Sequence, residues 1–337
     1  MVSIKDLAAA CGVSVATISK ALNGRSDISE ATRLRVLHIA ETMGYMPNSA
    51  ARALKTNRTY NLGVLFVDES QNGLTNEYFA AVLDAFKRAA EDEGYDITFI
   101  NRNIGKRQAG YLEHCRYRGV DGVVAACVDF ADPEVIRLMQ SDLPVVTVDY
   151  VFDNRAAVLS DNAAGMQQIV HHLGALGHRR IAYIHGERFS SVTEKRLAGY
   201  YKACAEAGIP TPDEYVLPAV YHDVQSSAVC TQKLLALPNR PTAILYPDDF
   251  SAVGGIHAAI DAGLCIPEDL SIAGYDGTPL AAALSPRLTT YRQDTNALGR
   301  RAAQLLIAQV DAPRSTLPEQ YTVSGRLQVG GSTAVSV

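Results

Sequence analysis

Beyond residue 60, short apolar runs alternate with longer segments whose apolar residues recur at helical spacing. The runs predict buried strands at 62–67, 96–100, 122–126, 145–148, 181–185, 243–246 and 271–274. The longer segments predict helices at 78–93, 108–118, 162–176, 194–207 and 250–262. Buried strands that alternate with helices are typical of α/β units with parallel sheets. This alternation of strands and helices occurs in two successive halves of the body, which predicts two Rossmann-like lobes. A small molecule is expected to bind between them, at the carboxyl ends of the strands.

The first sixty residues have a different, all-helical pattern. A first helix is predicted to end near Cys11, and a second covers about 15–22, with Ser14 placed to cap it. Ala8 is small where two helices approach closely, Gly12 can adopt the positive φ of a sharp turn, and Ile18 returns to the core. This joint spacing is that of a helix-turn-helix, and the alternative, an ordinary helical hairpin, lacks it.

In a helix-turn-helix, the first residues of the second helix reach base edges in the major groove. The candidates for DNA contact are therefore Val15, Ala16, Thr17, Ser19, Lys20 and Asn23. The apolar candidates suit thymine methyl groups, and the polar candidates suit phosphate or base acceptors. A third helix at about 29–43 is expected to turn four residues toward the core of this head: Leu34, Leu37, Ile39 and Ala40.

Residues 47–60 predict a short connecting segment. Pro47 is expected to end the regular structure of the head. Asn48 or Ser49 can cap a following helix that is too short to be stable alone in water. Such a helix would fold only against DNA or a second copy of itself. Ala51 and Leu54 are its candidates for DNA contact, because an apolar wedge such as Leu54 can enter a minor-groove base step. The alternative is a plain linker.

Charge is unevenly distributed along the 337 residues. Residues 1–60 hold 8 Lys and Arg against 4 Asp and Glu, and the rest hold 23 against 32, so the net charge of −5 combines a basic head with an acidic body. A basic head favours a polyanion such as DNA. No apolar run approaches the ~18 residues of a membrane span, and no signal peptide is evident, so a cytoplasmic protein without a membrane partner is expected. Scattered cysteines and the lack of clustered metal ligands predict neither a cofactor nor a metal site.

Several stretches carry a resemblance to a known family. They are Lys5-Asp6-Leu7-Ala8, residues 12–24 (GVSVATISKALNG), residues 44–54 (GYMPNSAARAL) and residues 288–294 (LTTYRQD). In order and spacing they resemble the lactose-repressor (LacI/GalR) family of bacterial transcription regulators. The resemblance implies three parts: a helix-turn-helix head at 1–46, a hinge helix and linker at 47–60, and a two-lobed, periplasmic-binding-protein-like core at 61–337.

The resemblance also implies how the core is built and assembled. Lobe one is expected at 61–160 and 293–324, and lobe two at 161–292 and 325–337. Two heads of a homodimer would read two operator half-sites, with the hinge helices pairing between them. The chain lacks an added heptad helix, so a tetramer of the lactose-repressor kind is not expected.

Asp149, Asp248 and Asp276 each follow a predicted strand, and together with Arg196 and Gln293 they match family positions that line the effector pocket. Tyr78 and Tyr221 are the candidates for an aromatic face, and Asp249 also matches a pocket position. A guanidinium and carboxylates suit the hydroxyls of a sugar, and a tyrosine can offer an aromatic face. Many relatives carry Asn where this chain has Asp248, which favours a neutral or cationic effector over a phosphorylated one. Alternatives stay open: Arg196 can form a structural ion pair, Tyr78 can be lobe packing, and Asp249 can cap the helix that begins at 250. Asp161 and Asn162 are also expected to form a helix cap.

The predicted function is a ligand-responsive repressor of carbohydrate-utilisation genes. It would bind operator double-stranded DNA as a homodimer and hold a sugar effector between its lobes, with a purine or a partner protein as the alternative effector. The helix-turn-helix disfavours a sugar-binding protein that serves transport. An enzyme is disfavoured because the adjacent Asp248 and Asp249 seldom place both carboxylates across one bond, and no nucleophile motif or phosphate loop is present.

Overall fold

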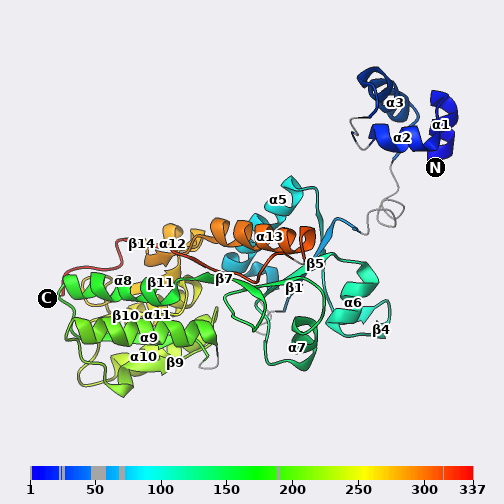
Figure 1. Ribbon diagram of the computed structural model, residues 1–337. Coiled ribbons are helices and arrows are strands. Elements are labelled where there is room, and N and C mark those ends of the chain that lie inside the picture. The colour runs from blue at the N-terminus through cyan, green and yellow to red at the C-terminus, as the bar shows by residue number, and fades with distance from the viewer. Residues whose placement is uncertain are drawn as a thin grey trace. The chain divides into compact units, whose positions relative to one another are not determined.

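The computed structural model describes residues 2–22, 24, 27–46, 58–67, 73–187, 190–313 and 315–336. The chain divides into two compact units, a helical head (Met1–Tyr60) and an α/β body (Asn61–Val337) (Figure 1). Within the described ranges, no helix is both long enough and apolar enough to cross a membrane.

The head consists of three helices: α1 (Ile4–Cys11), α2 (Val15–Leu22) and α3 (Glu30–Thr42). A capping box between Ser3 and Asp6 begins α1. Gly12 ends it with a φ of 65°, a left-handed conformation that glycine adopts without strain. The Ser14 hydroxyl accepts a hydrogen bond from the backbone N–H of Thr17 (3.1 Å), so the predicted cap of α2 is confirmed.

The prediction for the third helix is partly wrong. α3 buries Val36 and Ala40 in the head's core, and Ile39 packs at its edge. Leu34, however, is 56 % exposed and Leu37 is 40 % exposed. Val36 and Ala40 are four residues apart and share one helix face, so Leu34 and Leu37 are carried to other sides of the helix.

Lobe one of the body is built on a six-stranded sheet in the order β13–β7–β6–β5–β1–β2, in which every neighbouring pair is parallel. Its strands are β1 (Asn61–Phe66), β2 (Asp96–Phe99), β5 (Gly122–Ala126), β6 (Val145–Val148), β7 (Ala156–Ser160) and β13 (Gln320–Val323). On one face α5 (Glu77–Asp92) packs against α13 (Thr295–Asp311). α6 (Tyr111–Arg118) and α7 (Pro133–Met139) bury Tyr111 and Leu138 on the other face.

Lobe two contains a second six-stranded sheet in the order β14–β12–β11–β10–β8–β9, in which only β14 runs antiparallel to its neighbour. Its strands are β8 (Ile181–His185), β9 (Val216–Pro218), β10 (Ala243–Leu245), β11 (Ser271–Asp276), β12 (Thr289–Arg292) and β14 (Arg326–Gln328). α8 (Asn162–Ala175) and α9 (Ser191–Glu206) cover one face, and α10 (Val224–Leu235) and α11 (Asp249–Asp261) cover the other. Short elements complete the fold: η1 (Gly73–Thr75), η2 (Asp213–Tyr215) and α12 (Pro279–Ala283).

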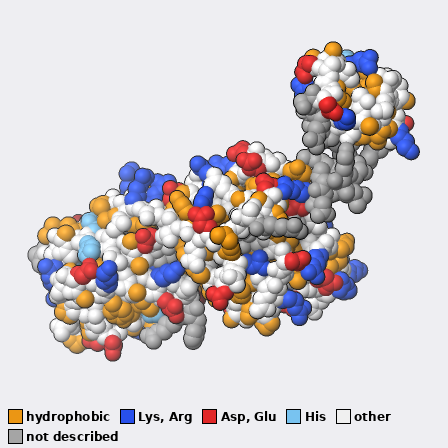
Figure 2. All heavy atoms as spheres, in the orientation of Figure 1, with side chains coloured by type: hydrophobic (Ala, Val, Ile, Leu, Met, Phe, Trp, Pro, Cys, Tyr) orange, Lys and Arg blue, Asp and Glu red, His pale blue; other side chains and the backbone are white. Residues whose placement is uncertain are grey.

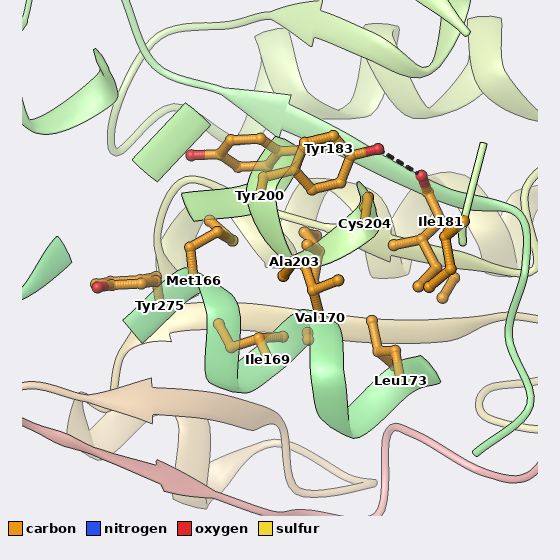
Figure 3. Packing of buried hydrophobic residues seen from close by; sticks show 14 of the residues in the cluster. Met166, Ile169, Val170, Leu173, Ile181, Tyr183, Tyr200, Ala203, Cys204 and Tyr275 are labelled. Atoms are coloured by element: carbon orange, nitrogen blue, oxygen red, sulfur yellow. Dashed lines mark hydrogen bonds between the residues drawn. The ribbon is translucent and has the colours of Figure 1, made fainter. Parts of the chain in front are cut away.

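The core under α8 and α9 shows how tightly lobe two is packed. Figure 3 shows Met166 and Ile169 of α8 and Tyr200 and Ala203 of α9 packed in one cluster with Tyr183 of β8. The buried Tyr200 hydroxyl donates to the carbonyl of Ile181 (2.8 Å), which satisfies its polar atom inside an apolar core. The two helices approach closely, and this rigid packing supports the polar residues at the ends of the strands.

One predicted helix begins later than expected. The 108–118 pattern forms a helix only from Tyr111, because β4 (Arg107–Gln108) pairs antiparallel with β3 (Asn103–Ile104) in a small hairpin. Among the described α-helices of the body, four were not predicted from periodicity: α7, α10, α12 and α13.

The chain crosses between the lobes three times, after β7, after β12 and between β13 and β14. Two hydrogen bonds tie these crossings together. The N–H of Asp161 donates to the carbonyl of Val323 (3.0 Å), and the N–H of Gly325 donates to the hydroxyl of Tyr291 (2.7 Å). The crossings therefore form one connected region between the two sheets.

Candidate functional site

Strained backbone gathers at the carboxyl ends of the strands. Cys127 follows β5, Asp149 follows β6, His222 comes soon after β9, and Asp276 ends β11. All four have a positive φ, from 53° to 99°, although none is glycine. Such conformations are costly for L-residues and are found preferentially at functional sites. This edge of each sheet is also where parallel α/β proteins bind ligands.

Arg196 lies at the centre of the lobe-two side and is only 4 % exposed. Its Nε donates to Asn162 Oδ1 (2.8 Å), its Nη1 donates to the carbonyl of Pro247 (2.6 Å), and its Nη2 lies 3.6 Å from Asp276 Oδ1. Its guanidinium also stacks over the ring of Tyr275, 3.6 Å from the centroid. The ion pair considered as the alternative for Arg196 is therefore present, and its contact with an effector stays a prediction.

Asp276 and Gln293 form a buried polar pair beside Arg196. Gln293 Nε2 donates to Asp276 Oδ1 (2.7 Å). Burial raises the pKa of Asp276 to about 6; Arg196 and Gln293 oppose this rise, and Asp248 and Asp149 add to it. Gln293 is 4 % exposed, and its Oε1 has no hydrogen-bond partner among the described residues. The pair therefore keeps an acceptor that a ligand could use.

The lobe-one side is organised around Asp149. Its carboxylate accepts hydrogen bonds from the Tyr78 hydroxyl (2.8 Å) and the backbone N–H of Ser160 (2.6 Å). Its carbonyl accepts from the Ser191 hydroxyl of α9 (3.0 Å), which links the two lobes directly. Tyr78 is 7 % exposed and packs edge-on against Phe79, so most of its ring is covered by the protein itself.

The two adjacent acids at the start of α11 have different roles. Asp248 is the N-cap, because its carboxylate accepts from the N–H of Ser251 (2.7 Å), and it also accepts from the N–H of His222 (2.8 Å). Asp249 is the first helical residue and accepts from the Thr290 hydroxyl (2.6 Å). Burial, followed by the charge of Asp276, raises the pKa of Asp249 well above its usual value. The expectation that Asp249 caps this helix is wrong, because the carboxylate that reaches the third helical amide comes from the preceding residue.

The expected cap of α8 is half right. Asp161 is its N-cap and accepts from the N–H of Ala164 (3.2 Å). Asn162 is the first helical residue, and its amide oxygen accepts from Arg196. Asn162 therefore belongs to the site, and its place at the carboxyl end of β7 was the signal that could have revealed it.

A small cavity of about 10 Å³ lies where these groups meet, with room for no more than about one water. Of the seven predicted pocket residues, Tyr78, Asp248 and Asp276 line it. Asp149, Arg196 and Gln293 contact these lining residues directly. Tyr221 lies farther back, where its hydroxyl hydrogen bonds to Thr193 (2.9 Å) and its ring lies against the backbone of Gly186.

Asp249, which also matched a pocket position, lines the cavity too, and five lining residues were missed from the sequence: Asn76, Glu77, His222, Phe250 and Thr278. The rings of His222 and Phe250 stack at 4.1 Å between centroids. His222 follows β9 and Phe250 follows β10, so the same rule of strand ends that selected Asp248 could have selected both.

The predicted DNA-contacting residues of the head are on the surface or close to it. Val15, Ala16 and Lys20 are exposed, and Thr17 and Ser19 are half-buried. Lys20 Nζ forms an ion pair with Asp27 Oδ2 (2.6 Å). The remaining candidates, Asn23, Ala51 and Leu54, lie outside the described residues, as does most of the predicted hinge helix. On the face of the body that Figure 2 shows, Lys and Arg lie among Asp and Glu side chains.

Comparison with known proteins decides the family. Residues 3–48 match bacterial regulatory proteins of the lacI family, and residues 170–333 match a periplasmic binding protein-like domain. The HTH-type transcriptional repressor PurR of Mannheimia succiniciproducens is 31 % identical over 324 residues, which are 94 % of this chain and 95 % of the relative. The chain belongs to the LacI family of bacterial regulatory proteins. It is a DNA-binding transcriptional repressor of this family and not an enzyme.

Solved structures of LacI-family proteins confirm the predicted fold. The lac repressor dimer bound to operator and the anti-inducer ONPF matches with a TM-score of 0.81 and 25 % identity, covering 99 % of both chains. A complex of the transcriptional regulator CelR with cellobiose matches with a TM-score of 0.71 and 25 % identity, covering 98 % of this chain and 100 % of the other. A helix-turn-helix head and a two-lobed core of parallel sheets are therefore shared with both.

Proposed function

We propose that this LacI-family repressor senses a sugar between its lobes, binds its operator as a homodimer in the cytoplasm, and controls carbohydrate-utilisation genes. The observation that carries the effector proposal is the convergence of Asp149, Asp248, Asp276, Arg196 and Gln293 around one cavity. Carboxylate and amide oxygens accept hydrogen bonds from vicinal hydroxyls, and a guanidinium donates to them. The similar regulator in complex with cellobiose supports the same ligand class.

The size of the cavity suggests how such a ligand would switch the protein. Ligand pockets usually enclose ~300–1,000 Å³, so a cavity of about 10 Å³ has to widen by a movement of the lobes. That movement would break the hydrogen bond from Ser191 to the carbonyl of Asp149. In our proposal the lobes pass this change to the head (1–46) through the hinge segment (47–60). The ligand acts only if it binds the two lobe arrangements with different affinities.

A purine is the second candidate effector. The His222–Phe250 stack lines the cavity, and an aromatic surface can bind the flat face of a nucleobase as well as that of a sugar ring. The curated relatives named PurR also favour this alternative.

A thermal-shift screen of neutral sugars, amino sugars and nucleobases on the full-length protein tests the effector. A ligand at 100 times its dissociation constant should add about 2.7 kcal/mol to the free energy of unfolding. Asp276→Asn should abolish the shift, whereas Asp261→Asn, exposed at the far end of α11, should retain it. A shift with nucleobases alone would replace the sugar proposal by the purine alternative. A shift that survives Asp276→Asn would place the ligand elsewhere.

Assembly is tested separately. Sedimentation of the full chain should give a dimer, and band shifts on operator fragments with one or two half-sites should show that tight binding needs both. A monomer that binds a single half-site equally well would contradict the proposed homodimer.

A further inference from the structure

The cavity between the lobes is lined by more acids than bases, and His222, which stacks on Phe250, is the one basic side chain among its described lining residues. Four carboxyl groups line it, from Glu77, Asp248, Asp249 and Asp276, and the described lining residues include no Lys or Arg. We infer that the effector carries a positively charged amino group, so that an amino sugar is the preferred class over a neutral sugar and over a phosphorylated or acidic one. This inference rests on the proposed sugar effector and names its charge.

Arg196 does not neutralise these acids. Two of its nitrogens donate to Asn162 and to the carbonyl of Pro247, and the third lies 3.6 Å from Asp276. Its face is occupied by Tyr275. Even with Asp249 counted as protonated, Asp248 and Asp276 in the lining and Asp149 beside Tyr78 are three carboxyl groups against one guanidinium, and among the described residues Arg196 forms its ion pair with Asp276. The site thus keeps an excess of negative charge that the protein itself does not balance.

This excess has an electrostatic cost that a cation would reduce. The pKa of Asp276 is raised to about 6, first by burial and also by the charges of Asp248 and Asp149, against the opposing effect of Arg196. Burial also raises the pKa of Asp249, with Asp276 adding to the effect. A neutral sugar would leave these carboxylates repelling one another in a medium of low polarity. An ammonium group placed among Asp149, Asp248 and Asp276 would reduce the repulsion between their carboxylates.

The hydrogen-bonding capacity of the site points the same way. Gln293 is 4 % exposed and holds Asp276 through its Nε2, and its Oε1 has no partner among the described residues. Each carboxylate can accept more than one hydrogen bond, whereas the side-chain donors of the lining are the Asn76 amide, the His222 ring and the hydroxyls of Tyr78 and Thr278. An ammonium group has three N–H donors and no acceptor. A phosphate or a carboxylate would instead add further acceptors and negative charge beside four carboxyl groups.

The test uses matched ligands and isothermal titration calorimetry with the full-length protein. D-glucose, D-glucosamine and D-glucose 6-phosphate form one series, and the galactose equivalents form a second. We expect the amino sugar of one series to bind about tenfold or more tightly than its neutral parent, as expected for hydrogen bonds to a charged group, and the phosphate not to bind. An affinity of the neutral sugar or the phosphate equal to or above that of the amino sugar would overturn the inference while leaving the sugar proposal intact. Binding of nucleobases alone would overturn both.

Variants separate a charge effect from a structural one. Glu77 is exposed in the first turn of α5, so Glu77→Gln should fold normally and remove one charge from the lining. We expect this variant to bind the amino sugar several-fold more weakly and to bind the neutral sugar with unchanged affinity. Asp248→Asn keeps a residue that can cap α11 and should lower the preference for the amino sugar further. Glu93→Gln, exposed at the other end of α5, is the matched control. The inference would be overturned if Glu77→Gln and Asp248→Asn lowered the affinities for the amino sugar and for the neutral sugar by the same factor.

Discussion

The head and the body hold their predicted functional side chains in opposite ways. In the head, Val15 and Lys20 are exposed, and the only contact described for the Lys20 side chain is a surface ion pair. In the body, Arg196 and Gln293 are each 4 % exposed and Asp248 is 5 % exposed, and all three are hydrogen bonded into the fold. The predicted DNA-reading surface should therefore tolerate substitutions with little effect on stability, whereas the predicted effector residues are part of the framework that holds lobe two together.

The largest effect is expected from Arg196→Ala. The change leaves Asp276 without its cation and Asn162 without its donor inside the protein. Breaking a buried pair by removing one partner costs about 3–5 kcal/mol. Urea unfolding of the body, followed by circular dichroism, should show a loss of this size. A loss below about 1 kcal/mol would mean that the site is not part of the framework, and the contrast with the head would disappear.

A pair of glycines tests whether the framework beneath the site is rigid. A Cβ on Gly199 of α9 would lie 2.4 Å from the carbonyl oxygen of Ala163, so Gly199→Ala should destabilise the body by about 1–3 kcal/mol. A Cβ on Gly174 of α8 would meet nothing closer than 3.4 Å, so Gly174→Ala should be neutral or stabilising by up to about 1 kcal/mol. Thermal unfolding of both variants gives the comparison. Equal changes in melting temperature would show that the two helices can separate.

The raised pKa of Asp276 predicts that the free energy of unfolding changes by about 1 kcal/mol between pH 7 and pH 5. Its pKa in the folded protein is about 6 against an ordinary value of 3.8, so the folded protein keeps a proton that the unfolded chain releases. The resulting stability is present below about pH 4 and is lost as the pH rises through 6. The charged and titratable groups around it are Arg196 on α9, Asp248 and Asp249 at the start of α11, Asp149 after β6, and Tyr78 on α5.

Asp276→Asn isolates this contribution from those of other groups. Between pH 7 and pH 5, the stability of the wild type should rise by about 1 kcal/mol relative to this variant, as measured by urea unfolding at each pH. Parallel pH profiles for the two proteins would refute the assignment.

The smallest change in stability is expected for Lys20→Ala. Its ion pair with Asp27 is about half exposed on both sides, and such pairs contribute at most about 1 kcal/mol. Operator binding should weaken even so, with the salt slope of log K reduced by about 1 if Lys20 contacts a phosphate. Filter binding at several salt concentrations, together with thermal unfolding, measures both. Unchanged binding would remove Lys20 from the DNA-reading surface.

Features that depend on neighbours in the chain could be predicted from the sequence. Gly12 and Ser14 mark the turn and the cap of the head because their roles involve residues only a few positions away. The alternation of apolar runs with helical segments predicted the parallel sheets, because burial on both faces requires continuous apolar strands. The acids that follow strands were found by the same local rule, and Asp248 and Asp276 do line the cavity.

Features that depend on distant partners could not be predicted in this way. Asn162 and Arg196 are joined by a hydrogen bond across a separation of 34 residues, and no periodicity encodes it. The exposure of Leu34 and Leu37 depends on which face of α3 the other two helices cover. Tyr221 follows the rule of strand ends, but its hydroxyl is held by Thr193, and its ring rests on Gly186 rather than lining the cavity.

The three crossings between the lobes determine how the protein should respond to a proteolytic cut. Each lobe is joined to the other by three separate peptide segments, and Asp161 and Gly325 tie these segments to one another. A single proteolytic cut in one crossing divides the chain into two fragments, but the strand pairs β7–β13 and β12–β14 and the packing of α5 on α13 should hold the fragments together under native conditions. A nicked protein of this kind would migrate as one species in a native gel and as two in a denaturing gel.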